Sequence, residues 1–278
     1  MLTTNLVPSL LAVSAGDVLG WLLWGVAAIA GLVVLFYLAI PWLVYATARI
    51  NSGDVFEEID VDQVRPEAHE YFARIGDGLV AIGYQPWLTL QLRGLVKSDN
   101  GGFAHSMVYA NRRERTMALV SVLIQPRADG DQHVLLQTEF ACENEEGHEF
   151  NATNAAGVAQ EVRDPKVTTV QARGLDDIRR LHAIHRALCR GERLRELPGE
   201  NELIAVLNEQ NRARLKRREV AGILYKDTDG VTYRPTAWGA YVLTARHLPP
   251  FTWLYWAKQR RLVTRLELEA GRTGASHA

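Results

Sequence analysis

Three residues of one predicted helix have side chains that can bind a metal. His182, His185 and Cys189 lie three and four positions apart, so their side chains share one face of a helix. Imidazole and thiolate groups are good zinc ligands, and a zinc site needs three or four of them held together. The same face carries three apolar residues, Ile178, Leu181 and Leu188. We therefore expect a half-buried packing surface with hydrogen-bonded histidines, and keep these three residues only as candidate metal ligands.

Polar side chains gather on two strands that we expect to pair. They are Thr138 and Glu139 on one strand and Asn151, Thr153 and Asn154 on the other. Alternation along a strand brings some of them to one face, where they form a hydrogen-bonding ladder on a solvated surface or one wall of a ligand pocket. The solvated surface is the expected outcome, and the pocket wall is the alternative.

The densest basic cluster is Arg212, Arg214, Lys216, Arg217 and Arg218. Such a cluster can meet the phosphates of anionic lipid or of nucleic acid. The formal net charge of the chain is −1, whereas a protein shaped for nucleic acid normally has a clear positive excess. We therefore expect a solvated helix end and no nucleic-acid partner.

Glycines at Gly76-Asp77-Gly78 have part of the spacing of a dinucleotide-binding loop. That loop needs a buried strand before it, and here a helical pattern precedes it, so we expect a helix end or a break in a helix. The sequence contains no P-loop, nucleophile elbow or paired-cysteine zinc motif. No catalytic residue and no cofactor is predicted, although catalytic groups that converge only in space leave no such motif.

A long apolar segment, residues 18–48, precedes the helices and strands that carry the candidate residues above. Residues 18–48 include no charged side chain, and about 20 apolar residues suffice for a helix to cross a bilayer. Trp21 and Trp24 lie near one end, and Trp42 and Tyr45 lie near the other, as expected at the two lipid–water interfaces. A signal peptide is the alternative, but residues 1–17 lack a basic residue and the apolar segment follows them. We predict one transmembrane helix.

Basic residues near the segment predict its orientation. The short N-terminal tail, residues 1–17, contains no Lys or Arg, whereas Arg49 follows the segment directly and Arg65 comes soon after. Because basic residues favour the cytoplasmic side, we expect a single-pass cell-membrane protein with its N-terminus outside. Ala27 and Gly31 are four positions apart, a spacing that can support a homo-oligomer but is common in such helices.

Behind the segment we expect an acidic connector at 49–64, a soluble domain at 65–270 and a flexible tail at 271–278. Hydrophobic residues make up 47% of the chain and charged residues 23%, which are ordinary values for a globular protein. With two cysteines there is no disulfide framework, so the domain must rest on its apolar core.

Periodicity predicts the order of the elements in this domain. A helix is expected at 66–79, and short polar turns join strands at 87–93, 107–110, 117–124, 133–142 and 149–153. Such short connections join antiparallel neighbours, which predicts a meander of four or five strands. Helices follow at 176–190, 200–220, 238–246 and 251–269, with a hairpin at 222–234. Strands followed by helices indicate an α+β fold with an antiparallel β-meander and packed helices.

The last of these helices starts with aromatic residues and continues with basic ones. Trp253 and Trp256 are followed by Arg260 and Arg261. Aromatic rings settle at the headgroup level and basic side chains meet anionic lipid, so we expect contact with the membrane interface. The alternative is that the aromatic rings complete the core of the domain.

Two functions remain open. The first is a non-catalytic, membrane-anchored cytoplasmic module that binds an unidentified protein partner or assists an envelope assembly. The alternative is a membrane-tethered enzyme or ligand-binding sensor of unknown substrate. A deep pocket with several ionisable groups favours the alternative, and a filled core without such a pocket favours the first.

Overall fold

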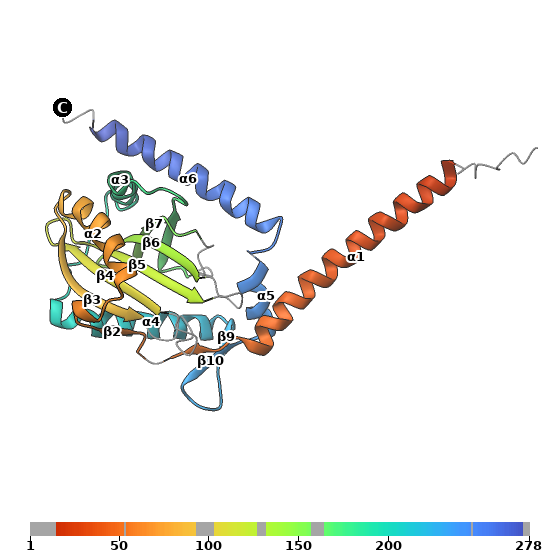
Figure 1. The fold of residues 1–278 in the computed structure, drawn as a ribbon, viewed down its shortest axis with the longest axis horizontal. Helices are drawn as coiled ribbons and strands as arrows, with labels where there is room; N and C mark the ends of the chain where they lie inside the picture. The colour runs from red at the N-terminus through yellow and green to blue at the C-terminus, as the bar shows by residue number, and fades with distance from the viewer. Residues whose placement is uncertain are drawn as a thin grey trace, which may run out of the picture.

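The computed structural model describes residues 15–52, 54–92, 103–126, 132–156, 164–245 and 247–274. Its first helix, α1 (Ala15–Thr47), extends away from the rest of the molecule (Figure 1). Residues Val18–Thr47 of this helix are long and apolar enough to cross a membrane. Trp21 and Trp24 are 78% and 77% exposed, because no other part of the described chain covers them. Residues 1–14 of the predicted tail lie outside the described residues.

A seven-stranded sheet forms the centre of the domain. Its strand order is β2-β3-β4-β5-β6-β7-β8, and all neighbours are antiparallel except β7 and β8. The five predicted meander strands are confirmed as β3 to β7. The strands are β2 (Phe56–Glu58), β3 (Gln85–Leu92), β4 (Phe103–Asn111), β5 (Thr116–Pro126), β6 (Gln132–Glu143), β7 (Glu149–Thr153) and β8 (Val167–Gln171).

The segment predicted as an acidic connector is part of this fold. It contains β1 (Ile50–Asn51), β2 and a short 3-10 helix, η1 (Val61–Gln63). β1 pairs with β10 (Thr232–Pro235), and β2 extends the large sheet by pairing with β3. Strands of two and three residues are too short to show alternation, so no periodic pattern predicted them.

Three helices cover one face of the sheet: α2 (Pro66–Val80), α3 (Ile178–Leu188) and α6 (Phe251–Gly274) (Figure 1). The main core lies between them and the sheet, with Leu79, Val120, Phe140 and Leu181 at most 1% exposed. Gly76 and Gly78 lie near the C-terminal end of α2, which stops at Val80, so the predicted helix end is confirmed and the alternative of a break inside the helix is wrong. A Cβ on Gly76 would come 2.5 Å from the Tyr109 hydroxyl, which shows that this glycine permits close packing.

Helix α4 (Glu200–Val220) lies on the opposite face of the sheet (Figure 1). Its Leu203 packs against Leu88 and Leu90 of β3. Asn208, 4% exposed, fixes the helix to β2: its side chain accepts from the backbone N–H groups of Val55 and Phe56 and donates to the carbonyl of Phe56. This buried amide therefore sets where α4 crosses the sheet.

A small second sheet joins the domain to α1. It has the order β1-β10-β9, where β9 is Leu224–Lys226, and the predicted hairpin is β9–β10. Helix α5 (Ala237–Ala245) packs against β10 and against the C-terminal part of α1. The final helix α6 continues to Gly274, so the predicted flexible tail at 271–278 begins inside a helix, and residues 275–278 lie outside the described residues. The α+β class is confirmed.

Candidate functional site

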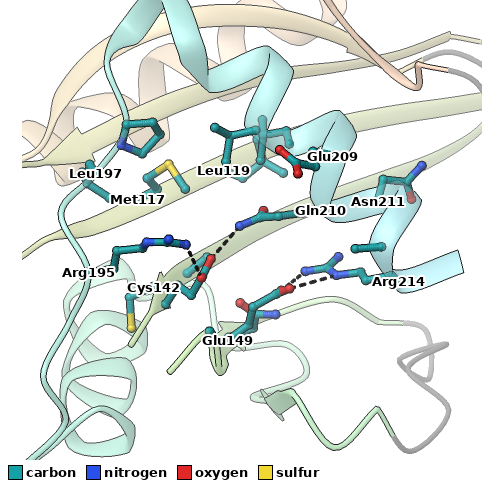
Figure 2. A pocket seen from close by; sticks show the side chains of 18 of the residues that line it. Met117, Leu119, Cys142, Glu149, Arg195, Leu197, Glu209, Gln210, Asn211 and Arg214 are labelled. Atoms are coloured by element: carbon teal, nitrogen blue, oxygen red, sulfur yellow. Dashed lines mark hydrogen bonds and ion pairs between the residues drawn. The ribbon is translucent and has the colours of Figure 1, made fainter. Parts of the chain in front are cut away.

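A cleft of about 620 Å³ lies between the sheet and α4. Strands β5, β6 and β7 provide its floor, α4 provides one side, and the segment from Arg195 to Pro198 closes one end (Figure 2). This volume is within the range of small-molecule binding pockets. Leu203 packs α4 against β3 and Asn208 fixes it to Val55 and Phe56 at the β2 edge of the sheet.

The floor of the cleft contains a buried amide without a partner. Asn151 of β7 is 2% exposed and lines the cleft, and its Nδ2 atom has no hydrogen-bond partner among the described residues. Leaving a buried donor unpaired costs about 1–3 kcal/mol. Because the Nδ2 atom is itself covered, an acceptor bound in the cleft would remove this cost only after the Asn151 amide turns toward the cleft.

Ion pairs connect the floor of the cleft with its sides. Glu143 of β6 accepts from Arg195 Nη1 at 2.8 Å and from Gln210 Nε2 at 2.9 Å (Figure 2). Glu149 of β7, 8% exposed, is paired with Arg214 of α4. These carboxylates are therefore neutralised within the protein and hold α4 and the 195–198 segment in place.

The predicted solvated basic cluster is largely paired with acids of the same domain. Arg217 Nε lies 2.7 Å from Asp164, and Arg212 Nη1 lies 2.6 Å from Asp54. Arg214 and Arg217 also line the cleft. The expectation of a fully solvated helix end is therefore wrong for the side chains that face the sheet, because α4 lies against acidic residues that are distant in sequence.

Apolar side chains line another part of the cleft. Met117 and Leu119 of β5 lie on the floor (Figure 2). Leu207 of α4 also lines the cleft. A ligand that satisfies this lining combines an apolar body with at least one hydrogen-bond acceptor for Asn151.

The alternative reading of the two polar strands is partly confirmed. Glu139 and Asn151 line the cleft, as a pocket wall requires. Thr138 faces the other side of the sheet, where its hydroxyl lies 3.3 Å from the Tyr71 hydroxyl, and its backbone N–H donates to Asn154 at 2.7 Å. Alternation along β6 divides the predicted group between the two faces.

The structure separates the three candidate metal ligands on α3. His182 Nε2 lies 2.8 Å from Glu114 Oε2, and the ring packs against Tyr84 and Phe140, so His182 has the packing role expected of it. His185 and Cys189 instead lie beside Cys142 of β6, and the three possible ligand atoms are within 4.8 Å of one another. The sequence analysis did not connect Cys142 with them, because residues so far apart have no local spacing to reveal the contact.

Comparisons of the chain with protein-family models, curated protein sequences and solved structures give no match. The chemistry of the cleft is therefore the basis for a functional proposal. Sequence reasoning missed Arg195 and Gln210, which line it. Neither residue belongs to a motif: Arg195 lies in the segment between α3 and α4, and Gln210 reaches the site because α4 packs on this face of the sheet.

The residues predicted to meet the membrane have different surroundings. Trp253 is 67% exposed, whereas Trp256 is partly covered, with the Arg173 guanidinium 5.2 Å from its ring centroid. Arg260 and Arg261 are exposed on α6. Near the C-terminal end of α1, Trp42 is 68% exposed, and its ring lies 5.6 Å from that of Tyr45.

Proposed function

We propose that this protein is a single-pass, membrane-anchored ligand-binding module, with its α+β domain in the cytoplasm. The cleft beside α4 binds a small amphipathic molecule that offers a hydrogen-bond acceptor to Asn151. The observation that supports this most strongly is the unpaired, buried Nδ2 atom of Asn151 in a cleft of about 620 Å³. Of the two functions expected from the sequence, the cleft favours the sensor over the partner-binding module.

The charges of the cleft restrict the ligand further. Glu143 and Glu149 already have cationic partners, so a ligand with a free positive charge would have to compete with Arg195 or Arg214. An uncharged acceptor, such as an amide, ester or hydroxyl oxygen, meets Asn151 without breaking either ion pair. We therefore propose an uncharged polar group on an apolar body as the chemical class.

The anchor keeps the domain at the membrane surface in this proposal. Helix α5 and the first turns of α6 lie on the side of the domain from which α1 leaves (Figure 1). Trp238 of α5 is 63% exposed, and Leu254 of α6, next to Trp253, is 64% exposed. Exposed apolar and aromatic side chains on the side of the domain next to the anchor suit the headgroup region of a bilayer. An amphipathic ligand also partitions into this region.

The proposal is tested by the small molecules that accompany the purified chain. The full chain, Asn151→Ala and the control Asn201→Ala are isolated from membranes, and small molecules extracted from each are identified by mass spectrometry. Asn201 is an exposed residue of α4, so its replacement leaves the cleft intact. We expect one compound in near-stoichiometric amount with the wild type and the control, reduced at least tenfold with Asn151→Ala. Equal small-molecule content in all three proteins, with no stoichiometric compound, contradicts the proposal.

A further inference from the structure

Two cysteines that are distant in sequence meet beneath α3. Cys142 lies on β6 and Cys189 is the C-cap residue of α3, and their Sγ atoms are 2.9 Å apart. The two residues are 5% and 8% exposed and pack with Phe150 of β7. The bond in a disulfide is about 2.05 Å, so a small approach of the two side chains would join the sulfurs.

A histidine accompanies the pair. His185 lies one helical turn before Cys189, and its Nε2 is 3.5 Å from Cys189 Sγ and 3.1 Å from the Phe150 carbonyl oxygen. His185 is fully buried, and its Nδ1 atom has no partner among the described residues. The carbonyl oxygen can only accept, so it favours the tautomer with the proton on Nε2.

A metal ion fits these three residues less well than a bond between the sulfurs. Sulfurs 2.9 Å apart, each about 2.3 Å from zinc, would enclose an angle of about 78° instead of the tetrahedral value of about 109°. A metal on His185 Nε2 would also displace the proton that this atom donates to Phe150 and leave a buried N–H at Nδ1.

We propose that Cys142 and Cys189 are a reversible thiol–disulfide pair, oxidised by a peroxide. This proposal does not rest on the ligand proposed for the cleft, although Cys142 also lines that cleft. The Cys189 thiolate attacks one oxygen of hydrogen peroxide, the O–O bond breaks, and the released hydroxide takes a proton to become water, which leaves a sulfenic acid on Cys189. The Cys142 sulfur then attacks the Cys189 sulfur, the S–O bond breaks, and the second hydroxide leaves as water with the proton of Cys142. Each sulfur loses one electron, and the peroxide is reduced to two waters.

The surroundings assign different roles to the two sulfurs. A hydrogen bond from the Cys142 thiol, and then a hydrogen bond from His185, lower the pKa of Cys189, while burial and Glu192 oppose this. The same Cys189 contact, together with burial, raises the pKa of Cys142. Cys189 is therefore the attacking thiolate and Cys142 the resolving thiol. Because both residues are buried, a small peroxide rather than a protein disulfide suits the site as oxidant.

Counting free thiols tests the pair directly, because the chain contains only these two cysteines. The full chain is reduced in detergent micelles, exposed to stoichiometric hydrogen peroxide, unfolded, and alkylated with a maleimide polymer that shifts its gel mobility. We expect two labels before peroxide, none after it, and two again after dithiothreitol, with the chain monomeric in the absence of reductant. Two labels after peroxide, or a disulfide-linked dimer, would overturn the proposal. Stoichiometric zinc that protects both thiols in the reduced chain would overturn it as well.

Variants separate the two roles. Cys142→Ser should trap the Cys189 sulfenic acid, detected as a dimedone adduct, whereas Cys189→Ser should leave the Cys142 thiol alkylatable after the same exposure. His185→Gln should slow disulfide formation about tenfold near neutral pH and have little effect above about pH 9, where Cys189 is ionised without help. His148→Gln is the matched control, because His148 pairs with Thr168 and packs on the Phe150 ring, but has no hydrogen bond to either thiol among the described residues. If His185→Gln lowers the rate of disulfide formation equally at every pH, the role of His185 is contradicted. If a variant fails to fold, the thiol count of the wild-type chain still tests whether the two cysteines form a disulfide.

Discussion

Two polar side chains fix how individual helices sit on a sheet that is otherwise packed by apolar residues. From the middle of α4, Asn208 satisfies three backbone groups at the start of β2, namely the N–H of the preceding Val55 and the N–H and carbonyl of Phe56. His182 joins α3 to the turn between β4 and β5 through Glu114. A buried polar residue with all its partners fixes one arrangement of the elements, because any shift leaves a group unpaired.

Asn208 should be essential for the position of α4. In Asn208→Ala the N–H groups of Val55 and Phe56 lose their acceptor, so we expect a loss of about 2–4 kcal/mol of unfolding free energy. Thermal unfolding of the full chain in detergent measures this loss, with the exposed Asn201→Ala as the control. A variant as stable as the control would show that α4 is held by its apolar contacts alone.

The pair of Glu114 and His182 predicts a pH-dependent stability. The hydrogen bond from His182, and then the charges of His182 and Arg186, hold the pKa of Glu114 below its ordinary value, although burial opposes them. A lowered folded-state pKa stabilises the protein above the unfolded-state pKa of about 4.3, and this contribution is lost as the pH falls through the folded-state pKa. Glu114→Gln should therefore destabilise the domain by about 1–2 kcal/mol at pH 7.

That difference from the wild type should shrink at a pH below the folded-state pKa of Glu114, where the carboxylate is protonated in both states. Unfolding curves at pH 7 and in acid measure it. Glu145→Gln, at an exposed position, is the control and should change little at either pH. A constant difference at all pH values would mean that Glu114 acts through packing and not through its charge.

Among the elements, those with regular periodicity were predicted and those defined by distant contacts were not. Alternating residues and short polar turns predicted β3 to β7 and their antiparallel order, and helical spacing predicted α2 to α6. The edge strands β2 and β8 were not predicted. β2 has only three residues, and β8 pairs in parallel with β7 after a long connection. The same limit applies to the cleft: alternation suggested a polar wall with Glu139 and Asn151, but no local pattern placed α4 across it.

The surface of α5 and of the first turns of α6 gives a prediction about membrane contact. The exposed Trp253 should enter the headgroup region, whereas Trp256 is held by Arg173 and should be needed for folding instead. Hydrogen exchange of the full chain in nanodiscs should show stronger protection at 251–256 with anionic lipid than in detergent. Trp253→Ala should remove the difference without lowering the melting temperature, and Trp256→Ala should lower it. Equal exchange in both environments contradicts membrane contact.

At the scale of the whole molecule, one exposed apolar helix extends from a domain that has its own core. The side chains of α1 have no cover within the described chain along most of its length, which suits a lipid environment and leaves Ala27 and Gly31 open to a second copy. The homo-oligomer stays a prediction.

The orientation of this helix also stays a prediction, and it decides where the cleft and the thiol pair operate. Arg49 after the helix and the lack of basic residues in 1–17 are the basis for predicting a cytoplasmic domain. A reporter that is active only in the cytoplasm should work when fused after Ala278, and one that is active only after export should not. The reverse result would place the domain outside, where the two thiols would be oxidised permanently.

The most direct test of the ligand-binding proposal is an experimental structure of the full chain purified from its native membrane, at a resolution that shows ordered water. We predict connected density for a non-protein molecule between α4 and the floor of the cleft, with an acceptor about 2.9 Å from Asn151 Nδ2. Density for isolated waters alone, with Asn151 Nδ2 paired to one of them or to a neighbouring side chain, would contradict the proposal.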